Sequence, residues 1–187
     1  MTFCSTCGTR LPAPPPVTCP TCGAEHYRNA KPCAGALVMS GGKLLLMRRA
    51  HEPWLDHWDI PGGFCEVDEH PSATAAREAR EETGFDVVIT GFLGMWLDGY
   101  PDPTRTEAPS VTLNAYYHAV PVAGAAPGRA DPEEAAEVAW FEPGALPEPI
   151  AFPGHALDVL EAWQAAVKEG RTVTPLPDLP EGWEKAH

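Results

Sequence analysis

Three glutamates lie close together in one short segment: Glu78, Glu81 and Glu82. If residues 71–83 are helical, Glu78 and Glu82 are one turn apart on the margin of a face of small residues, while Glu81 is turned further towards solvent. Three carboxylates at this spacing repel one another, and a divalent cation among them would relieve the repulsion. Mg²⁺ and Mn²⁺ prefer carboxylate oxygen as a ligand. A solvated acidic face is the usual explanation for such a helix, so the surrounding residues must decide.

Four cysteines near the N-terminus form two C-x-x-C pairs, each followed by a glycine, Gly8 or Gly23. A C-x-x-C turn lets two thiolates face one ion, and the glycine supplies the positive φ that the turn needs. Two such turns provide four thiolates in tetrahedral coordination, which suits Zn²⁺. Redox-active pairs are the alternative, but no βαβ pattern surrounds either pair. The arrangement resembles a zinc ribbon, with Cys4, Cys7, Cys19 and Cys22 as the expected ligands.

Two helices are expected in the rest of the chain. Pro71 and Gly84 suit the start and the end of a helix over 71–83. A second helix is expected over 154–168, close to the C-terminal end. Apolar residues at helical spacing predict its buried face, which is made of Leu157, Leu160, Trp163 and Val167.

Apolar runs predict the strands that position these helices. Residues 34–39 and 43–47 flank a Ser-Gly-Gly turn, which predicts a β-hairpin. Residues 111–120 alternate apolar and polar side chains, as in a strand with one buried face. Residues 85–97 are expected to form one or two strands, and residues 138–141 a short one.

Composition and charge restrict the class of protein. The chain has 187 residues, of which 44% are hydrophobic, and 26 acidic against 13 basic residues give a formal charge of −13. So acidic a chain is a poor candidate for binding the phosphate backbone of nucleic acids. No apolar run is long enough for a membrane span, and the N-terminus lacks the basic and apolar regions of a signal peptide. A cytoplasmic protein with reduced thiols is therefore expected.

The sequence predicts three regions. Residues 1–32 carry three basic residues against one acidic residue and form the expected zinc ribbon. Residues 33–170 carry the predicted strands and helices and most of the acidic residues, and they form the main domain. Residues 171–187 are rich in proline and are expected to be a loosely held tail.

Residues 63–85, GFCEVDEHPSATAAREAREETGF, combine fixed residue types with fixed spacings. The pattern resembles the Nudix box at every fixed position, and the preceding residues 58–64, WDIPGGF, also resemble this family. The one departure is Ala79, where the family usually has a larger aliphatic residue. The resemblance covers about residues 33–170, and an N-terminal zinc ribbon occurs in the branch that includes NADH pyrophosphatases. The matched positions are Gly63, Glu69, Arg77, Glu78, Glu81, Glu82 and Gly84.

This resemblance implies a fold of class α/β, an α/β/α sandwich with a mixed sheet. It implies that Glu78 and Glu82 hold a catalytic Mg²⁺ or Mn²⁺ together with the carbonyl of Gly62. Glu81 is implied to contribute through a second metal or a water. Four further residues of the box are implied to be structural and to orient the helix and its loop: Gly63, Glu69, Arg77 and Gly84.

A general base is expected among the acidic residues that follow the box. In many members of the family a loop glutamate completes the site, and Glu134 and Glu137 lie in an acidic loop before Trp140. A carboxylate there can take a proton from the attacking water. Either residue is explained equally well as an exposed loop glutamate.

Several basic and aromatic residues are expected near the substrate. Arg48 and Arg49 close a predicted strand beside the box, and because side chains alternate along a strand, one of the two points to the wrong face. Aromatic residues can stack on a base or a nicotinamide ring, although core packing explains each of them as well. These aromatic candidates are Trp58, Trp96 and Tyr100, with Trp54 also near the expected cleft and Arg105 as a contact for phosphate or ribose.

The resemblance implies hydrolysis of the pyrophosphate bond in a nucleoside diphosphate linked to another moiety. NADH pyrophosphatases also carry a signature S-Q-P-W-P-F-P-x-S after the box, which residues 94–103 do not match. An ADP-ribose-like substrate is therefore expected first and NAD(H) second, giving AMP and a phosphorylated product.

The alternatives are a ligand-sensing module without catalysis and a nucleic-acid-binding protein that uses the ribbon. A small-molecule nucleotide is the expected partner, and a homodimer is compatible with the sequence.

Overall fold

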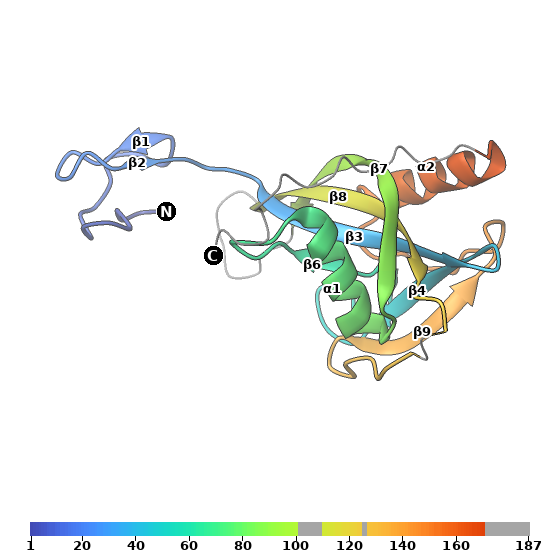
Figure 1. Cartoon of the computed structure of the whole chain (residues 1–187). Helices are drawn as coiled ribbons and strands as arrows, with labels where there is room; N and C mark the ends of the chain where they lie inside the picture. The colour runs from blue at the N-terminus through green and yellow to red at the C-terminus, as the bar shows by residue number, and fades with distance from the viewer. Residues whose placement is uncertain (101–109, 125–126, 171–187) are drawn as a thin grey trace, which may run out of the picture. The chain divides into compact units, whose positions relative to one another are not determined.

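The structure is a computed structural model of the chain, and it describes residues 1–100, 110–124 and 127–170. The chain divides into two compact units, Met1–Ala30 and Lys31–His187 (Figure 1). The tail expected over 171–187 lies outside the described residues. None of the helices in the described part has the length and apolar character needed to cross a membrane.

Two tight turns and a short strand pair hold the N-terminal unit together. Gly8 and Gly23 have φ angles of 73° and 75°. Their N–H groups donate to the carbonyls of Cys4 and Cys19 at 2.9 and 3.0 Å, so each glycine closes a C-x-x-C turn in the conformation that its missing Cβ allows. The two paired antiparallel strands are β1 (Val17–Thr18) and β2 (Glu25–His26).

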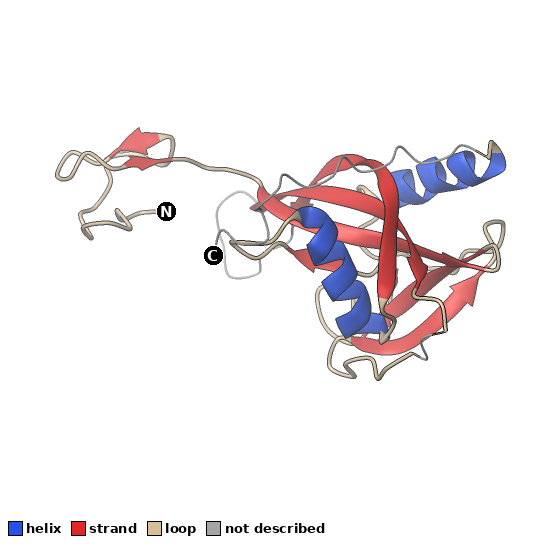
Figure 2. Cartoon of the chain, in the orientation of Figure 1, coloured by secondary structure: helices blue, strands red, loops and turns tan. Residues whose placement is uncertain are grey.

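A seven-stranded mixed sheet forms the centre of the larger unit (Figure 2). Five strands follow the order β5-β4-β3-β8-β7, while β6 pairs with β3 and β9 pairs with β4. β3 and β8 run parallel, and the other pairs are antiparallel. The strands are β3 (Lys31–Ser40), β4 (Lys43–Arg49), β5 (Trp58–Asp59), β6 (Gly62–Phe64), β7 (Val87–Tyr100), β8 (Ser110–Pro121) and β9 (Ala135–Phe141).

Two helices cover opposite faces of this sheet (Figure 1). Helix α1 (Pro71–Thr83) packs its alanines on a cluster that includes Leu45, whereas α2 (Ala156–Lys168) packs Trp163 on a cluster that includes Leu44 and Leu46. Because successive side chains of a strand point to opposite faces, β4 contributes to both cores. The predicted α/β/α sandwich with a mixed sheet is thus confirmed.

The buried face of α2 differs from the expected one. Leu160 and Trp163 are buried as predicted, but Leu157 is 50% exposed and Val167 is 37% exposed. The helix instead buries positions 156, 159, 160 and 163, a single stripe with spacings of three and four residues. Leu157 lies about 100° away from position 156 around the helix axis, which takes it off this stripe. The prediction that Leu157 and Val167 point inward is wrong.

Candidate active site

Helix α1 begins and ends at residues with clear local signals. The Ser72 N–H donates to His70 Nδ1 at 3.2 Å, so the His70 side chain caps the first turn while Pro71 opens the helix. Gly84 has a φ of 75°, and its N–H donates to the Arg80 carbonyl at 2.9 Å, which closes the last turn. The bounds Pro71–Thr83 agree with the predicted segment, so the glutamates take the expected positions around the helix.

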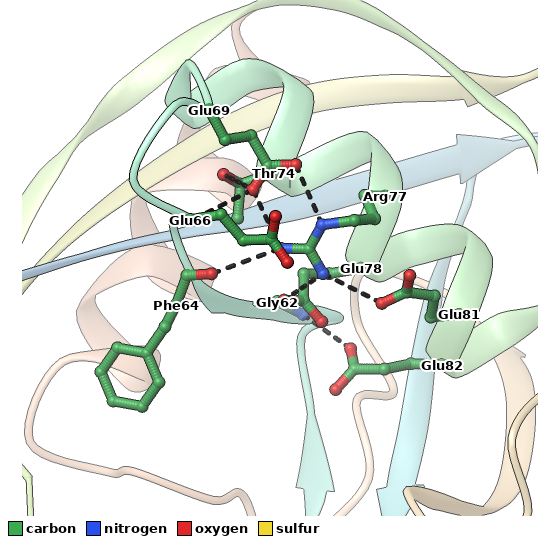
Figure 3. A network of polar contacts seen from close by, with 9 residues as sticks. All are labelled: Gly62, Phe64, Glu66, Glu69, Thr74, Arg77, Glu78, Glu81 and Glu82. Atoms are coloured by element: carbon green, nitrogen blue, oxygen red, sulfur yellow. Dashed lines mark hydrogen bonds and ion pairs between the residues drawn. The ribbon is translucent and has the colours of Figure 1, made fainter. Parts of the chain in front are cut away.

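Three glutamates meet beside α1. Carboxylate oxygens of Glu78, Glu82 and Glu134 all lie within 4.8 Å of one another. The Gly62 N–H donates to Glu82 Oε2 at 2.8 Å and holds this carboxylate, which is buried (Figure 3). A donor set of carboxylate oxygens alone fits a hard divalent cation and not a soft one.

Glu134 reaches this cluster because its loop is attached to the end of α1. The Gly128 N–H donates to the Gly84 carbonyl at 2.6 Å, and the Asp131 N–H donates to the Glu81 carbonyl at 3.0 Å. On the other side, the Ala50 N–H donates to the Glu134 carbonyl at 2.9 Å. These bonds fix the loop between α1 and the end of β4, so a residue more than 50 positions after the helix supplies the third carboxylate.

Burial and mutual repulsion raise the pKa values of two of these carboxyls. The pKa of Glu82 is well above its usual value, first because the side chain is buried and then because Asp59 adds negative charge, although the Gly62 N–H opposes the shift. The pKa of Glu78 is also raised, mainly by burial, with Arg77 opposing. A site that buries adjacent carboxylates gains stability when a cation binds among them.

Arg77 connects the acidic residues around the helix to the preceding loop (Figure 3). Its Nη1 donates to Glu78 Oε1 at 2.8 Å and to Glu81 Oε2 at 2.9 Å, and its Nη2 donates to the Phe64 carbonyl at 3.3 Å. It also donates to both carboxylate oxygens of Glu69. The hydrogen bonds between these two lower the pKa of Glu69 and raise the pKa of the Arg77 guanidinium. One arginine therefore sets the position of several carboxylates.

The carboxylate cluster opens on a cleft of about 500 Å³. Two arginines and six carboxylates are among the residues that line it, a formal balance of −4. A pyrophosphate group would add further negative charge, so it requires cations to enter this cleft. The charged lining residues are Arg49, Arg77, Asp59, Glu66, Glu78, Glu82, Asp98 and Glu134.

The cysteines of the N-terminal unit form a second cluster of metal-binding groups. All four Sγ atoms lie within 4.8 Å of one another, with Cys4 and Cys22 at 3.6 Å and Cys7 and Cys19 at 3.7 Å. His26 Nε2 lies 3.2 Å from Cys4 Sγ, as an outer partner of that ligand. Four converging thiols fit a zinc ion.

Comparison with known proteins decides the family. The profile of the NUDIX domain matches residues 30–169. The chain belongs to the Nudix family. The NAD-capped RNA hydrolase NudC of Stutzerimonas stutzeri (strain A1501) is 30% identical over 182 residues, and the alignment covers 95% of this chain and 60% of that protein. The chain thus spans about 60% of the length of this relative.

A further relative and a solved structure agree with this assignment. A MutT-like protein of Streptomyces ambofaciens is 32% identical over 133 residues, which are 71% of this chain and 76% of that protein. The crystal structure of a NUDIX hydrolase from Nitrosomonas europaea is similar with a TM-score of 0.71 and 29% identity, covering 92% of this chain and 96% of that chain.

The Nudix box places its glutamates in two different environments. Nudix hydrolases use divalent metal ions, and Glu78 and Glu82 lie together at the cleft, with Gly62 beside them. The Glu81 side chain is 50% exposed and faces Arg77 at 2.9 Å, and it is not among the residues that line the cleft. Any role of Glu81 at a metal therefore needs a second ion or a water.

The two candidate bases are separated in this Nudix fold. Glu134 belongs to the carboxylate cluster, whereas Glu137 pairs with Arg48 of β4 at 3.2 Å. Arg48 also pairs with Asp56 at 2.8 Å. Among the described residues that line the cleft, neither Glu137 nor Arg48 is present. The structure brings Glu134 to the site and leaves this ion pair outside it.

Arg49, the neighbouring arginine, does line the cleft but has its own partners. Its Nη1 donates to Asp59 Oδ2 at 3.0 Å and its Nε to the Pro53 carbonyl at 2.8 Å, and both charged side chains are buried. The Arg49 guanidinium also lies over the Phe152 ring at 5.0 Å. Its charge is therefore already neutralised by Asp59.

The aromatic candidates mostly pack in the core. Trp58 contacts Phe141 with ring centroids 4.8 Å apart, and Trp96 meets Tyr116 edge-on at 5.9 Å. Neither tryptophan lines the cleft within the described part of the chain. Trp54 lies 6.2 Å from the Phe152 ring. The side chain of Tyr100 and all of Arg105 lie outside the described residues.

The sequence analysis missed a group of polar residues that line the cleft. Thr112, Asn114 and Tyr116 form the face of β8 opposite to the alternating apolar residues, and this face is buried in the centre of the sheet. In a strand with only one buried face, these polar side chains would face solvent. They are buried instead, because β8 lies between β3 and β7 inside the sheet. Polar side chains that are buried there must meet other polar groups or a ligand. Further missed lining residues are Asp59, Asp98, Phe152 and His155.

Proposed function

We propose that the chain hydrolyses the pyrophosphate bond of a nucleoside diphosphate linked to another moiety. ADP-ribose-like compounds are the first choice of substrate and NAD(H)-like compounds the second. The observation that carries the proposal is the meeting of Glu78, Glu82 and Glu134 in a cleft lined by an excess of negative charge. A pyrophosphate can bind in such a cleft only together with cations. In metal-assisted hydrolysis, the bound cation also promotes the reaction.

Glu78 and Glu82 are the proposed ligands of a divalent cation, Mg²⁺ or Mn²⁺, with the carbonyl of Gly62 as a further ligand. Glu81 is proposed to act through a second ion or a water. When bound, the cation neutralises phosphoryl oxygens and polarises the phosphorus atom. The all-oxygen donor set and the burial that raises the pKa of Glu82 support this assignment.

The chain's own residues are proposed to position these groups and to move one proton. Arg77 orients Glu78 through a hydrogen bond of 2.8 Å, and the Gly62 N–H orients Glu82. Glu134 is the proposed base and accepts the proton of the attacking water at a carboxylate oxygen. Within the described residues nothing donates a hydrogen bond to the Glu134 carboxylate, so both of its oxygens are available.

The cysteine cluster is proposed to hold one structural Zn²⁺ ion. Four thiolates complete a tetrahedral shell, which leaves no position for a substrate or a catalytic water. Such ligands must stay reduced, and this requirement is consistent with the cytoplasm as the site of action. The zinc site is therefore expected to support folding of the ribbon and not the hydrolysis itself.

Product analysis tests the proposed reaction. Purified protein is incubated with ADP-ribose, NADH or an NAD-capped oligoribonucleotide, with and without Mg²⁺, and the products are separated by chromatography. We expect AMP and ribose 5-phosphate from ADP-ribose only when the cation is present. Release of free adenosine or nicotinamide would mean that another bond is cut. Binding without turnover, with Mg²⁺ or Mn²⁺, would favour a ligand-sensing module instead.

The substrate ranking is tested in the same experiment. The capped RNA is included because the NudC relative acts on NAD-capped RNA by its name. The formal charge of −13 disfavours binding of a long phosphate backbone, so we expect ADP-ribose to be cleaved faster than the capped RNA. Faster cleavage of NADH or of capped RNA would reverse the ranking and leave the reaction class unchanged.

A further inference from the structure

The cleft contains a second polar group besides the carboxylate cluster. Asp98 Oδ2 lies 2.7 Å from His155 Nδ1, and His155 Nε2 lies 2.8 Å from the Tyr116 hydroxyl. His155 is 4% exposed and Tyr116 is 7% exposed, and all three residues line the cleft. They come from β7, from the loop before α2 and from β8, so the folded chain brings together positions far apart in the sequence.

For a neutral His155 ring, the hydrogen-bond partners assign a position to each proton. Asp98 accepts from Gly99 N–H at Oδ1 and therefore binds the histidine as an acceptor at Oδ2, which places the ring proton on His155 Nδ1. In the neutral ring Nε2 is then an acceptor, and the Tyr116 hydroxyl donates to it. The proton of Tyr116 is used in this way, so its oxygen meets a ligand in the cleft as an acceptor.

Asn114 supplies a second acceptor on the same face of β8, two residues before Tyr116. Its Nδ2 donates to the Trp96 carbonyl at 3.3 Å and to Thr112 Oγ1 at 3.0 Å, and a carbonyl can only accept, which fixes the orientation of the amide. Asn114 is 7% exposed, and its Oδ1 has no partner among the described residues.

This oxygen must open on the cleft. In the described part of the chain, the one fully enclosed side-chain polar atom without a partner is Trp54 Nε1. Because Asn114 Oδ1 lacks a partner and is not fully enclosed, it is accessible from the cleft that Asn114 lines. A buried amide oxygen left without a donor costs free energy, and a ligand that donates a hydrogen bond would remove that cost.

The cations that line the cleft do not change this acceptor character. Arg49 is paired with buried Asp59, and Arg77 is paired with Glu69, Glu78 and Glu81. Both arginines among the described lining residues therefore already have carboxylate partners. This wall therefore favours a neutral group that carries hydrogen-bond donors and disfavours an additional phosphate.

We propose that Tyr116 and Asn114 form a subsite for the hydroxyl groups of a ribose attached to the pyrophosphate. His155 and Asp98 are positioning residues that keep the tyrosine hydroxyl oriented. The proposal rests on the proposed function, since the pyrophosphate lies at the carboxylate cluster of the same cleft. If the terminal ribose occupies the subsite, the proposal also predicts discrimination against substrates in which phosphate replaces that sugar, such as nucleoside triphosphates.

The test compares Tyr116→Phe with Tyr117→Phe. Tyr117 is the next residue of β8, is also buried and points to the opposite face, so its replacement controls for loss of a buried hydroxyl. Each protein is assayed with ADP-ribose, with the analogue that lacks the 2′-hydroxyl of the adenosine and with the analogue that lacks the 2-hydroxyl of the terminal ribose. The two analogues identify which ribose occupies the subsite.

We expect Tyr116→Phe to lower kcat/KM for ADP-ribose about tenfold, mainly through KM, because one hydrogen bond to the substrate is lost. For the wild-type protein, kcat/KM should be lower by a similar factor with one of the two deoxy analogues than with ADP-ribose. For Tyr116→Phe, kcat/KM should be the same with that analogue as with ADP-ribose. Tyr117→Phe should behave as wild type. Equal losses with every substrate, or an unchanged preference, would overturn the subsite.

A second variant guards against damage to the fold. Asn114→Leu removes the unpaired acceptor and should reduce the difference in kcat/KM between ADP-ribose and the deoxy analogue that the wild-type protein disfavours, while thermal melting reports whether each variant is folded. If the wild-type protein hydrolyses no substrate, the proposed function fails. The subsite is then tested by equilibrium dialysis, which measures the affinity of each protein for labelled ADP-ribose in the presence of Mg²⁺. Equal affinities of wild type and Tyr116→Phe in that measurement, or no binding by wild type, would contradict it.

Discussion

Arg77 Nε lies 2.9 Å from Glu69 Oε1, and Arg77 Nη2 lies 3.0 Å from Glu69 Oε2. This two-point contact joins the loop that precedes α1 to the second turn of the helix. The same guanidinium also bonds Glu78, so the position of a proposed metal ligand depends on the contact between loop and helix. A planar group with several donors can make all of these bonds together, whereas a single ammonium cannot.

Arg77→Lys is therefore expected to be a damaging substitution. It should lower the free energy of unfolding by about 1–3 kcal/mol, because charged hydrogen bonds are lost without replacement, and it should lower kcat because Glu78 loses its partner. Thermal melting and steady-state hydrolysis check both effects. Arg80→Lys is the matched control, since the Arg80 side chain is 72% exposed and pairs only loosely with Asp86 at 3.4 Å. Equal behaviour of the two variants would refute the role of Arg77.

Glu82→Gln should be the most damaging change in the Nudix box. It keeps the size of the side chain and removes the charge of the buried carboxylate, so we expect a loss in rate of about a hundredfold or more. Glu81→Gln removes the same charge from the exposed side of the same helix and should cost less. Initial rates over a titration with Mg²⁺ measure both variants. Near-native turnover of Glu82→Gln would show that the metal assignment is wrong.

Glu134→Gln and Glu137→Gln distinguish the two acidic candidates, of which Glu134 lies in the loop before β9 and Glu137, expected in that loop, lies within β9. Glu134 lies in the carboxylate cluster, and its substitution should lower kcat strongly because the proposed proton acceptor is lost. Glu137 pairs with Arg48 at a half-exposed position, and exposed ion pairs contribute little to stability or function. We expect its substitution to leave the rate close to wild type. A larger effect at Glu137 than at Glu134 would contradict this order.

The stability of the metal-free protein should fall as pH rises from acidic to neutral values. The pKa of Glu82 is raised in the folded chain, so its contribution is greatest below the ordinary value of 4.5 and is lost as pH rises through the raised pKa. Glu69 has a lowered pKa and acts in the opposite sense, since its stabilising contribution is lost as pH falls. Melting temperatures over a pH series without added Mg²⁺ or Mn²⁺ measure the net effect of these two groups and of Glu78, whose pKa is also raised.

Mg²⁺ and Glu82→Gln separate the two contributions. Added Mg²⁺ should raise the melting temperature more at neutral than at acidic pH, because the ion binds the ionised carboxylates. Glu82→Gln should remove much of the fall in melting temperature between acidic and neutral pH. It should leave the fall in melting temperature at acidic pH, which comes from Glu69, unchanged. Parallel pH profiles for wild type and variant would exclude Glu82 as the source of the dependence.

Cys19→Ser tests the second metal site. Elemental analysis should find about one zinc per wild-type chain and none in the variant, because a tetrahedral thiolate site loses one of four ligands. The variant should fold in lower yield, and whatever folds should keep an unchanged requirement for Mg²⁺. Wild-type protein without zinc after growth in zinc-rich medium would rule out the assignment.

Local signals explain which parts of the site could be read from the sequence. Helix α1 has the predicted bounds because Pro71 and Gly84 act within a single turn of the chain. Once those ends are set, the spacing of the box alone places Glu78 and Glu82 at the cleft. The left-handed glycines of the C-x-x-C turns follow from the same kind of short-range geometry.

Features that depend on distant contacts could not be read in this way. The choice between Glu134 and Glu137 depends on how the loop binds the end of α1, through Gly128 and Asp131. The contact between His155 and Asp98 joins residues 57 positions apart, and nothing in the local pattern marks either of them. The inward face of α2 was misjudged for a related reason, because a sheet decides which stripe of a mostly apolar helix it covers.

Gly63 is required because it has no side chain beside the Glu78 carboxylate, and not because of its backbone conformation. Its φ is not positive, yet a Cβ at this position would lie 2.6 Å from Cδ of Glu78. The hydrogen side chain at 63 and the carboxylate at 78 therefore occupy one shared volume. An alanine at position 63 would therefore displace the Glu78 carboxylate from the place where it meets Glu82 and Glu134, so a change at a residue that carries no charge would act on the acidic cluster.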